Sequence, residues 1–452
     1  MTRDKRNSTA KLVATLGFVA ALVCTSSPIL AETPRREPPS TRRTVSRGES
    51  QAAQSSATIS PEWFDDHLAD PALRALAADR FAAHHRLTRT DMLAIFAAAA
   101  DGGTIDDDEF QTLRVLVQNA KGLGMPAYVA DLSRKVVLGD PANAHFQGEP
   151  LGNLEIGSPA EQLDRLVKKW FLGQDPPAID AKSHYQKAAG VLFDGAPKLF
   201  DLHQGELGDC YFIACLGEVA MRDPQQIARM FIDNHDGTFT VRFFNRGKPY
   251  YVTVDRYFPV DAKGRFVYEN RGNAPDNANN VLWVALAEKA LAQLNESGWL
   301  TTAGKAGENS FLAIGVGGKS RNALPLITGL ATARDGLESI GGFTQGELQL
   351  ANSKKEVPSF LVPTHSYAVV GYDPDRAEVR LFNPWGLHGN KKDIKYGEFT
   401  MSWQDFWTDF QNIDHAPLKP KSDTATPTKN VARNTAAPKS APIQTASIAT
   451  AR

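Results

Sequence analysis

The sequence predicts an α+β protein in which an all-helical region precedes a mixed unit of helices and strands. Apolar residues recur at helical spacing through residues 61–180. From 181 to 416 a helical stretch is followed by runs in which apolar and polar residues alternate, which is the pattern of half-buried strands. Residues 32–60 and 417–452 have neither pattern and few core-forming side chains, so we expect a disordered linker and a disordered tail.

The first 31 residues have the features of a secretory signal peptide. Four basic residues precede position 12, and an apolar run of thirteen residues, Leu12 to Cys24, follows. A run of this length is too short to span a bilayer, so we expect cleavage after Ala31 and a secreted or periplasmic protein with no membrane span. A lipid-modified Cys24 is the less favoured alternative, because bulky Val23 stands where a small residue is required.

The charge of the chain excludes one class of partner. Lys and Arg number 50 against 51 Asp and Glu, but residues 1–60 hold 9 against 4 and residues 417–452 hold 6 against 1. The remaining 35 against 46 give the middle a net charge of about −11, which repels phosphate polymers. We therefore expect no nucleic-acid partner. Three cysteines are too few for a disulfide-built scaffold, and Cys210 and Cys215, five residues apart, are expected as free thiols.

The helical region is expected to contain four or five helices. Helix-period apolar positions occur in PALRALAADRFAAHH, DMLAIFAAA, DEFQTLRVLVQNA and AEQLDRLVKKWFL. Residues 98–110 have the spacing of a calcium-binding EF-hand loop, but Ala98, Ala100 and Gly102 stand where ligands are needed. We expect a helix–loop–helix without metal, in which the acids cap the second helix.

Alternation predicts strands in the mixed unit at TFTVRFF, KPYYVTVDRYFPV, SYAVVGYD and AEVRLFNP. The glycine-rich AIGVGGKS, residues 313–320, nearly matches a phosphate-binding loop, but Ala313 stands at the first required glycine. We expect these glycines instead to lie beside a cleft, where another backbone can approach closely.

Cys210 is the candidate nucleophile. A glycine-rich loop ends at Asp209, and the apolar residues that follow have helical spacing, so Cys210 is expected at a helix N-terminus. The helix dipole and the unpaired NH groups there lower the pKa of a thiol. Gln204 is expected to point its amide at the space beside the backbone NH of Cys210, and two such donors form an oxyanion hole. Cys215 falls on the apolar face of the helix and is expected to pack in the core.

A thiolate nucleophile needs a base, and His365 opens the alternating segment HSYAVVGYDP. Asn383 closes the next segment, VRLFNPWG, so a hairpin would bring the two side chains together. In that geometry His365 exchanges a proton with Cys210, and Asn383 accepts a hydrogen bond from the other ring nitrogen. Trp385 is expected to cover that bond from water. The three residues would form a Cys–His–Asn triad.

At these residues the chain resembles the calpain family of papain-like cysteine proteases. QGELGDCYFIAC resembles the family's active-site motif, LWVALAEKALAQLN a helix motif and NPWG its asparagine motif; with GEFTMSWQDF the match covers about 185–416. The resemblance implies a two-lobed protease core with Cys210 in one lobe and His365 and Asn383 in the other, facing across a substrate cleft. It also implies that Gln204 and Cys210 donate to the oxyanion.

Two departures from the family pattern lie next to these motifs. Tyr211 follows the cysteine where the family usually has Trp, which keeps a planar aromatic ring. Pro363 and Thr364 precede His365 where the family usually has Gly, so the shape of the neighbouring subsite is left open.

The resemblance also implies two calcium sites, and the ligands are only partly present. At the first site Asp201 and Glu288 match family acids. At the second, Glu398 remains, while Gly389 and Tyr396 stand where carboxylates are expected. Calcium takes six to eight oxygens, several of them charged. We therefore expect no required cofactor, and calcium at most to tune activity through the first site.

The sequence thus predicts a secreted calpain-like cysteine endopeptidase of bacterial type that acts on proteins or peptides. Two alternatives stay open: acyl transfer to an amine, as in transglutaminases, which generally orient the His with Asp rather than with an Asn such as Asn383, and a catalytically silent binding protein. Residues 61–180 are expected to be either a built-in regulator that lies across the cleft or a permanent accessory domain. The sequence does not predict the oligomeric state.

Overall fold

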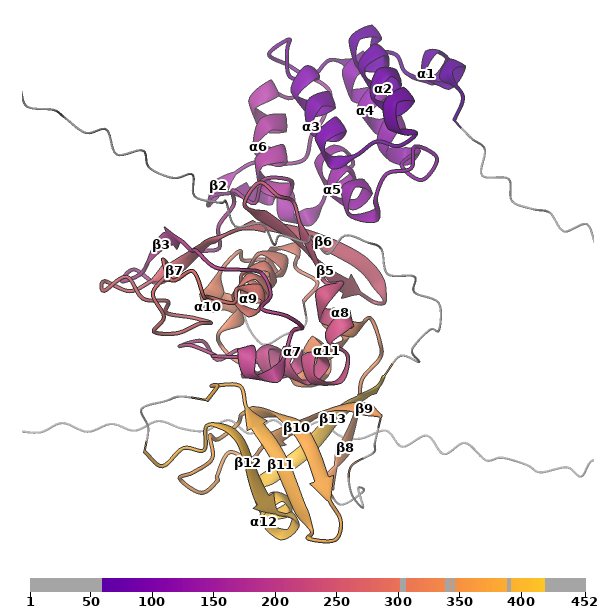
Figure 1. The fold of residues 1–452 in the computed structure, drawn as a ribbon. Coiled ribbons are helices and arrows are strands. Elements are labelled where there is room, and N and C mark those ends of the chain that lie inside the picture. The colour runs from indigo at the N-terminus through magenta and orange to yellow at the C-terminus, as the bar shows by residue number, and fades with distance from the viewer. Residues whose placement is uncertain (1–58, 301–305, 338–342, 344–345, 388–391, 419–452) are drawn as a thin grey trace, which may run out of the picture. The chain divides into compact units, whose positions relative to one another are not determined.

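The structure, a computed structural model, describes residues 59–300, 306–337, 343, 346–387 and 392–418 (Figure 1). The predicted signal peptide, most of the predicted linker and nearly all of the predicted tail lie outside these ranges. The elements in chain order are α1 (Pro61–His67), α2 (Pro71–His84), α3 (Arg89–Ala98), α4 (Asp107–Gln118), α5 (Ala127–Val137), η1 (Pro141–Ala144), β1 (His145–Phe146), β2 (Glu149–Pro150), α6 (Ala160–Trp170), β3 (His184–Lys187), η2 (Leu199–Asp201), α7 (Cys210–Arg222), α8 (Pro224–Ala228), β4 (Phe231–Asp233), β5 (Thr238–Asn245), β6 (Lys248–Asp255), β7 (Tyr257–Val260), α9 (Trp283–Leu294), η3 (Asn295–Ser297), α10 (Phe311–Ile314), α11 (Ser320–Thr328), β8 (Ala333–Gly336), β9 (Glu347–Ser353), β10 (Ser366–Asp373), β11 (Glu378–Asn383), β12 (Gly397–Ser402), α12 (Trp403–Asp409) and β13 (Phe410–Pro417).

Residues 61–180, all of which the structure describes, contain six α-helices where the sequence predicted four or five. The four segments named from the sequence form α2, α3, α4 and α6. The sequence missed α5 and α1, and α1 has only seven residues, too few to display a helical period of apolar positions.

Helix α4 begins at a reciprocal cap. The backbone NH of Glu109 donates to the Asp106 carboxylate at 2.8 Å, and the backbone NH of Asp106 donates to the Glu109 carboxylate at 2.8 Å. The acids of the segment that has EF-hand spacing therefore cap a helix, as predicted.

Helix α7, which begins at Cys210, is the buried centre of the mixed unit. Every residue from Tyr211 to Ala220 is buried. The helix contacts α11 on one side and strands β9 and β10 of the large sheet on another. A small antiparallel sheet, in the order β4-β5-β6, packs its strands against α9 and α11.

The large sheet has six antiparallel strands in the order β12-β11-β10-β9-β13-β8 (Figure 1). Alternate residues of a strand point to opposite faces. Accordingly, Leu350 and Ala368 join the hydrophobic cluster that contains α7, whereas Ala351, Tyr367 and Val369 join a second cluster with α12. The predicted mixture of helices and antiparallel strands is confirmed.

The helical region and the mixed unit share one hydrophobic cluster. It contains Leu166 and Trp170 of α6 together with Val252 and Val254 of β6. The predicted boundary near residue 180 is therefore not a break in the core. Within the described ranges, no helix combines the length and the apolar character needed to cross a bilayer.

Candidate active site

The loop before α7 places Cys210 at the first position of that helix, where the sequence predicted it. Two glycines of the loop have no room for a side chain. A Cβ at Gly205 would lie 2.1 Å from the carbonyl oxygen of Tyr268, and a Cβ at Gly208 would lie 2.5 Å from that of Gly315. Both glycines therefore allow the close backbone packing that positions the nucleophile.

The two described thiols differ in accessibility. Cys210 is partly exposed, whereas Cys215 is fully buried. The Cys215 sulfur lies 3.1 Å from the carbonyl oxygen of Tyr211 and 3.6 Å from that of Ser320, so this residue packs in the core as expected. Cys210 is the thiol that a substrate can reach.

His365 lies directly before β10, and Asn383 ends the neighbouring strand β11. The imidazole Nε2 lies 3.0 Å from the Asn383 Oδ1, and the Asn383 amide donates to the carbonyl oxygen of Lys395 at 2.8 Å. The indole of Trp385 packs edge-on against the imidazole, with ring centroids 5.6 Å apart. The hairpin predicted from the sequence thus brings these side chains together, and the His365 Nδ1 remains for proton exchange.

Thr364 has the conformation that glycine favours. Its φ is 49°, in the left-handed region, and its hydroxyl donates to the carbonyl oxygen of Pro363 at 2.8 Å. The chain therefore keeps, without glycine, a backbone turn immediately before His365. The subsite that the sequence left open carries a threonine side chain at this point.

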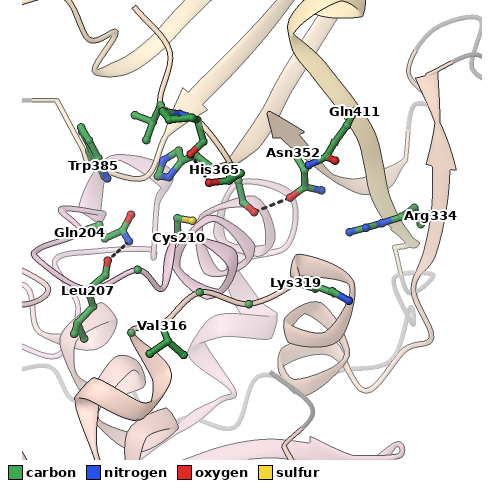
Figure 2. A pocket seen from close by; sticks show the side chains of 18 residues that line it. Gln204, Leu207, Cys210, Val316, Lys319, Arg334, Asn352, His365, Trp385 and Gln411 are labelled. Carbon is green, nitrogen blue, oxygen red and sulfur yellow. Dashed lines mark hydrogen bonds between the residues drawn. The ribbon is translucent and has the colours of Figure 1, made fainter. Parts of the chain in front are cut away.

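One cavity of about 720 Å³ gathers four of the five predicted site residues: Gln204, Cys210, His365 and Trp385 line it (Figure 2). The first two lie in the loop before α7 and at the start of that helix, and the last two lie next to β10 and β11 of the large sheet. Asn383 is fully buried behind His365 and does not line the cavity. Leu207 and Val316 add apolar surface to the wall, and the glycines that follow Val316 leave their backbone open to the cavity.

The Gln204 side chain does not point at the space where the sequence placed it. Its amide nitrogen donates to the carbonyl oxygen of Leu207 and to the Asp209 carboxylate, both at 2.9 Å. A primary amide has two NH donors, so both are engaged. Gln204 can donate to an oxyanion only by giving up one of these bonds. The sequence could not indicate this, because the competing acceptors are set by the loop conformation.

The electrostatics of the pair also differ from the expectation for a helix N-terminus. Burial raises the pKa of the Cys210 thiol to about 12, although the NH and hydroxyl of Ser366 oppose the shift. Burial lowers the pKa of the His365 imidazole to about 4, and the hydrogen bond to Asn383 opposes this only in part. Desolvation is the largest effect on both groups, and it favours the neutral thiol and the neutral imidazole.

Ser366 is a site residue that the sequence missed. Strand alternation suggests that a residue following His365 points to the other face, yet both residues line the cavity. Its hydroxyl donates to the side-chain oxygen of Asn352 at 2.7 Å. The strand begins only at Ser366, so alternation does not apply across this pair.

The acids that match calcium ligands have other partners. The Asp201 carboxylate accepts from the indole NH of Trp283 at 2.9 Å, and the Glu288 carboxylate accepts from the backbone NH of Glu269 at 3.1 Å. Where the chain is described, no three His, Cys, Asp or Glu side chains are arranged to hold a metal ion. Each of these bonds uses one carboxylate oxygen, and the second oxygen of Glu288 has no hydrogen-bond partner among the described residues, so calcium at the first site stays a prediction. Gly389 of the second site lies outside the described residues.

Comparison with known proteins locates the similarity on this site. Residues 182–393 match the family described as "Calpain family cysteine protease". The chain is 27% identical to Calpain-13 of Rattus norvegicus over 305 residues, which are 56% of this chain and 42% of that protein. It is 26% identical over 288 residues to the calpain-type cysteine protease ADL1 of Oryza sativa subsp. japonica and 28% identical over 299 residues to the calpain-type cysteine protease DEK1 of Arabidopsis thaliana.

The two plant matches cover 55% and 58% of this chain, but each covers only 13% of the plant protein. It therefore spans less than half the length of the curated relatives it matches. These relatives come from animals and plants, so the bacterial origin and the secretion expected from the sequence remain predictions. The matched segment contains Gln204, Cys210, His365 and Asn383. Over residues 182–393 the chain is thus similar to the protease domain of calpains, which supports a cysteine-type endopeptidase.

Proposed function

We propose that the protein is a cysteine endopeptidase that hydrolyses peptide bonds through Cys210, His365 and Asn383. One observation carries the proposal: an accessible cysteine at a helix N-terminus shares a cavity with a histidine whose outer ring nitrogen is held by a buried asparagine. This arrangement lets Cys210 act as the nucleophile and His365 as the base and then the acid.

The reaction proceeds in two stages. The Cys210 sulfur attacks the peptide carbonyl carbon while its proton passes to the His365 Nδ1, because thiol and imidazole start uncharged. The backbone NH of Cys210 and the released amide of Gln204 stabilise the oxyanion. His365 then protonates the leaving amine, and water, deprotonated by the same imidazole, hydrolyses the thioester and restores the thiol.

We also propose that the chain acts outside the cytoplasm on protein or peptide substrates. The basic start and the thirteen-residue apolar run support this proposal. Mass spectrometry of the exported protein tests it: a mature N-terminus at Glu32 is expected, and an uncleaved chain retained in the cell would contradict it.

A transferase and a silent binding protein are the alternatives to hydrolysis. Incubation with an unfolded protein, with and without a thiol alkylator, separates catalysis from binding: the proposal expects cleavage that the alkylator abolishes. An added primary amine separates hydrolysis from transfer, since a transferase would release products that carry the amine. Unfolded protein left intact in every arm would contradict the proposed activity.

A further inference from the structure

The charged residues that line the active-site cavity are both cations. Among its eighteen lining residues, all of them described, Lys319 and Arg334 carry a full charge, and there is no Asp or Glu. Figure 2 shows both cations on the side of Cys210 away from Trp385 and Gln204. The cavity therefore has a positive end beside the nucleophile.

Arg334 is fixed at this end by a hidden carboxylate. Its Nε and Nη2 donate to Asp414 at 2.5 and 2.7 Å, and the Asp414 side chain is fully buried while 28% of the Arg334 side chain is exposed. Asp414 also accepts from the hydroxyl of Ser320 at 2.8 Å and the backbone NH of Arg321 at 3.0 Å. The anion is thus saturated and out of reach, whereas the guanidinium faces the cavity.

Lys319 adds a positive charge that, unlike the charge of Arg334, has no ion-pair partner among the described residues. The residue is exposed, precedes the first turn of α11 and lines the cavity. Its ammonium group forms no ion pair with any residue that the structure describes. A ligand that brings one carboxylate to this end would meet two cationic groups, and carboxylates form charge-assisted hydrogen bonds with both types.

We propose that this end of the cavity selects peptides that place the side-chain carboxylate of Glu or Asp against Lys319 and Arg334. Selection during cleavage rests on the proposed endopeptidase function. Exposed charge pairs are individually weak, so two of them should give roughly a threefold to tenfold preference for Glu over Gln. The free terminal carboxylate of a short peptide has the same chemistry, and the test separates the two sources.

The test first identifies the substrate position that prefers an acidic residue and then reverses the charge of residue 319. Digestion of a peptide library followed by mass spectrometry identifies the substrate position with the strongest acidic preference. Matched peptides with Glu or Gln there, each with a free or an amidated C-terminus, are then compared for kcat/KM with wild type and Lys319→Glu. Lys248→Glu, at an exposed lysine of β6 outside the cavity, makes the same change in net charge. Arg334 is left intact because its loss would strip buried Asp414 of its partner.

In wild type and in Lys248→Glu, we expect kcat/KM to be threefold to tenfold higher for the Glu peptide than for the Gln peptide. In Lys319→Glu this ratio should fall to 1 or below. A ratio of kcat/KM for Glu over Gln peptides that is near 1 at every position would overturn the inference. A Glu preference that Lys319→Glu leaves unchanged would also overturn it. A preference that follows the free C-terminus instead of the side chain would overturn the assignment to an internal residue.

Binding separates this inference from the proposed function. Fluorescence anisotropy measures the affinity of Cys210→Ala, alone and combined with Lys319→Glu, for a set of labelled octa-alanine peptides. Each peptide carries a single Glu or a single Gln, and the substituted position differs from one peptide to the next. Glu-specific binding that depends on Lys319, without cleavage by wild type, would leave the inference standing and remove the proposed activity. Equal binding of Glu and Gln peptides would overturn the inference even if wild type cleaves both.

Discussion

Cys210 and His365 do not form an ion pair in the resting site. Burial raises the pKa of the thiol to about 12 and lowers the pKa of the imidazole to about 4, so between these values both groups are neutral. Proton transfer therefore accompanies attack on the carbonyl. The Gln204 amide donates to Leu207 and Asp209 in the resting site. It must release one of these hydrogen bonds in the same step, when the oxyanion forms and competes for the NH group.

The neutral thiol predicts slow alkylation of Cys210 in the absence of substrate. The labelling rate with iodoacetamide should rise about tenfold per pH unit from pH 7 to pH 10, because the thiolate is the reactive form. Peptide-level mass spectrometry separates Cys210 from Cys215. A rate that already reaches a plateau between pH 5 and pH 8 would show a preformed thiolate and contradict the assignment.

The sequence indicated which site residues lie close together, but it did not indicate their protonation states. Motif order and the predicted hairpin were enough to bring His365 to Asn383. The pKa shifts depend on how much water the folded protein removes, and the bonds of Gln204 depend on the loop that carries Leu207 and Asp209. Neither property has a pattern along the chain.

Two adjacent lysines of α6 have opposite environments. Lys169 is fully buried, and its ammonium donates to Asp175 at 2.5 Å and to Glu296 at 2.6 Å. Lys168 is 40% exposed and pairs with Asp164 one turn away. Because Glu296 lies on η3, Lys169 ties the helical region to the mixed unit.

Replacing these lysines with methionine should have unequal effects on stability. Lys169→Met removes the cationic partner of two buried carboxylates and should cost about 3–5 kcal/mol, whereas Lys168→Met should change stability by less than about 0.5 kcal/mol. Urea unfolding of both variants measures the difference. Equal stabilities would show that Lys169 is not the link between these elements.

The sequence predicted α6 from its apolar period but could not distinguish Lys169 from Lys168. The partner that identifies the buried lysine is 127 residues away. The same contacts bear on the role of the helical region. None of the cavity-lining residues belongs to residues 61–180, all of which are described, and the choice between a regulator and an accessory domain stays a prediction.

The whole molecule buries several acids whose protonation couples stability to pH. Glu218 of α7 accepts from the backbone NH of Gln349 on β9 at 3.0 Å, and burial raises its pKa to about 7. Burial likewise raises the pKa of Asp209 to about 6 and of Glu296 to about 7. A raised pKa means that the folded state holds the proton longer, so stability falls as pH rises toward 7. The lowered pKa of His365 acts in the opposite direction below about pH 6.5.

We therefore predict lower stability at pH 8 than at pH 5.5. Glu218→Gln should reduce this difference by about 2 kcal/mol, because the neutral amide no longer loses a proton. Glu161→Gln, at an exposed position of α6, should leave it unchanged. Urea unfolding at the two pH values measures both effects. Stability that rises from pH 5.5 to pH 8 would contradict the assignment of buried, protonated acids.

Calcium should not be required for activity. The second site lacks two acids, since Gly389 and Tyr396 stand where carboxylates are expected, while the first site retains Asp201 and Glu288. Cleavage of an unfolded protein should therefore persist in a chelator, with at most a modest change in millimolar calcium. Complete inactivity in the chelator that calcium restores would contradict this prediction.

In the proposed mechanism, peptide hydrolysis depends on the Cys210 thiol. The most direct measurement is kcat/KM on an unfolded protein substrate for wild type, Cys210→Ser and Cys215→Ala. Cys210→Ser should lose activity by several orders of magnitude because the hydroxyl is a far weaker nucleophile, whereas Cys215→Ala should retain kcat/KM and lose only stability. Undiminished hydrolysis by Cys210→Ser would show that the Cys210 thiol is not the nucleophile.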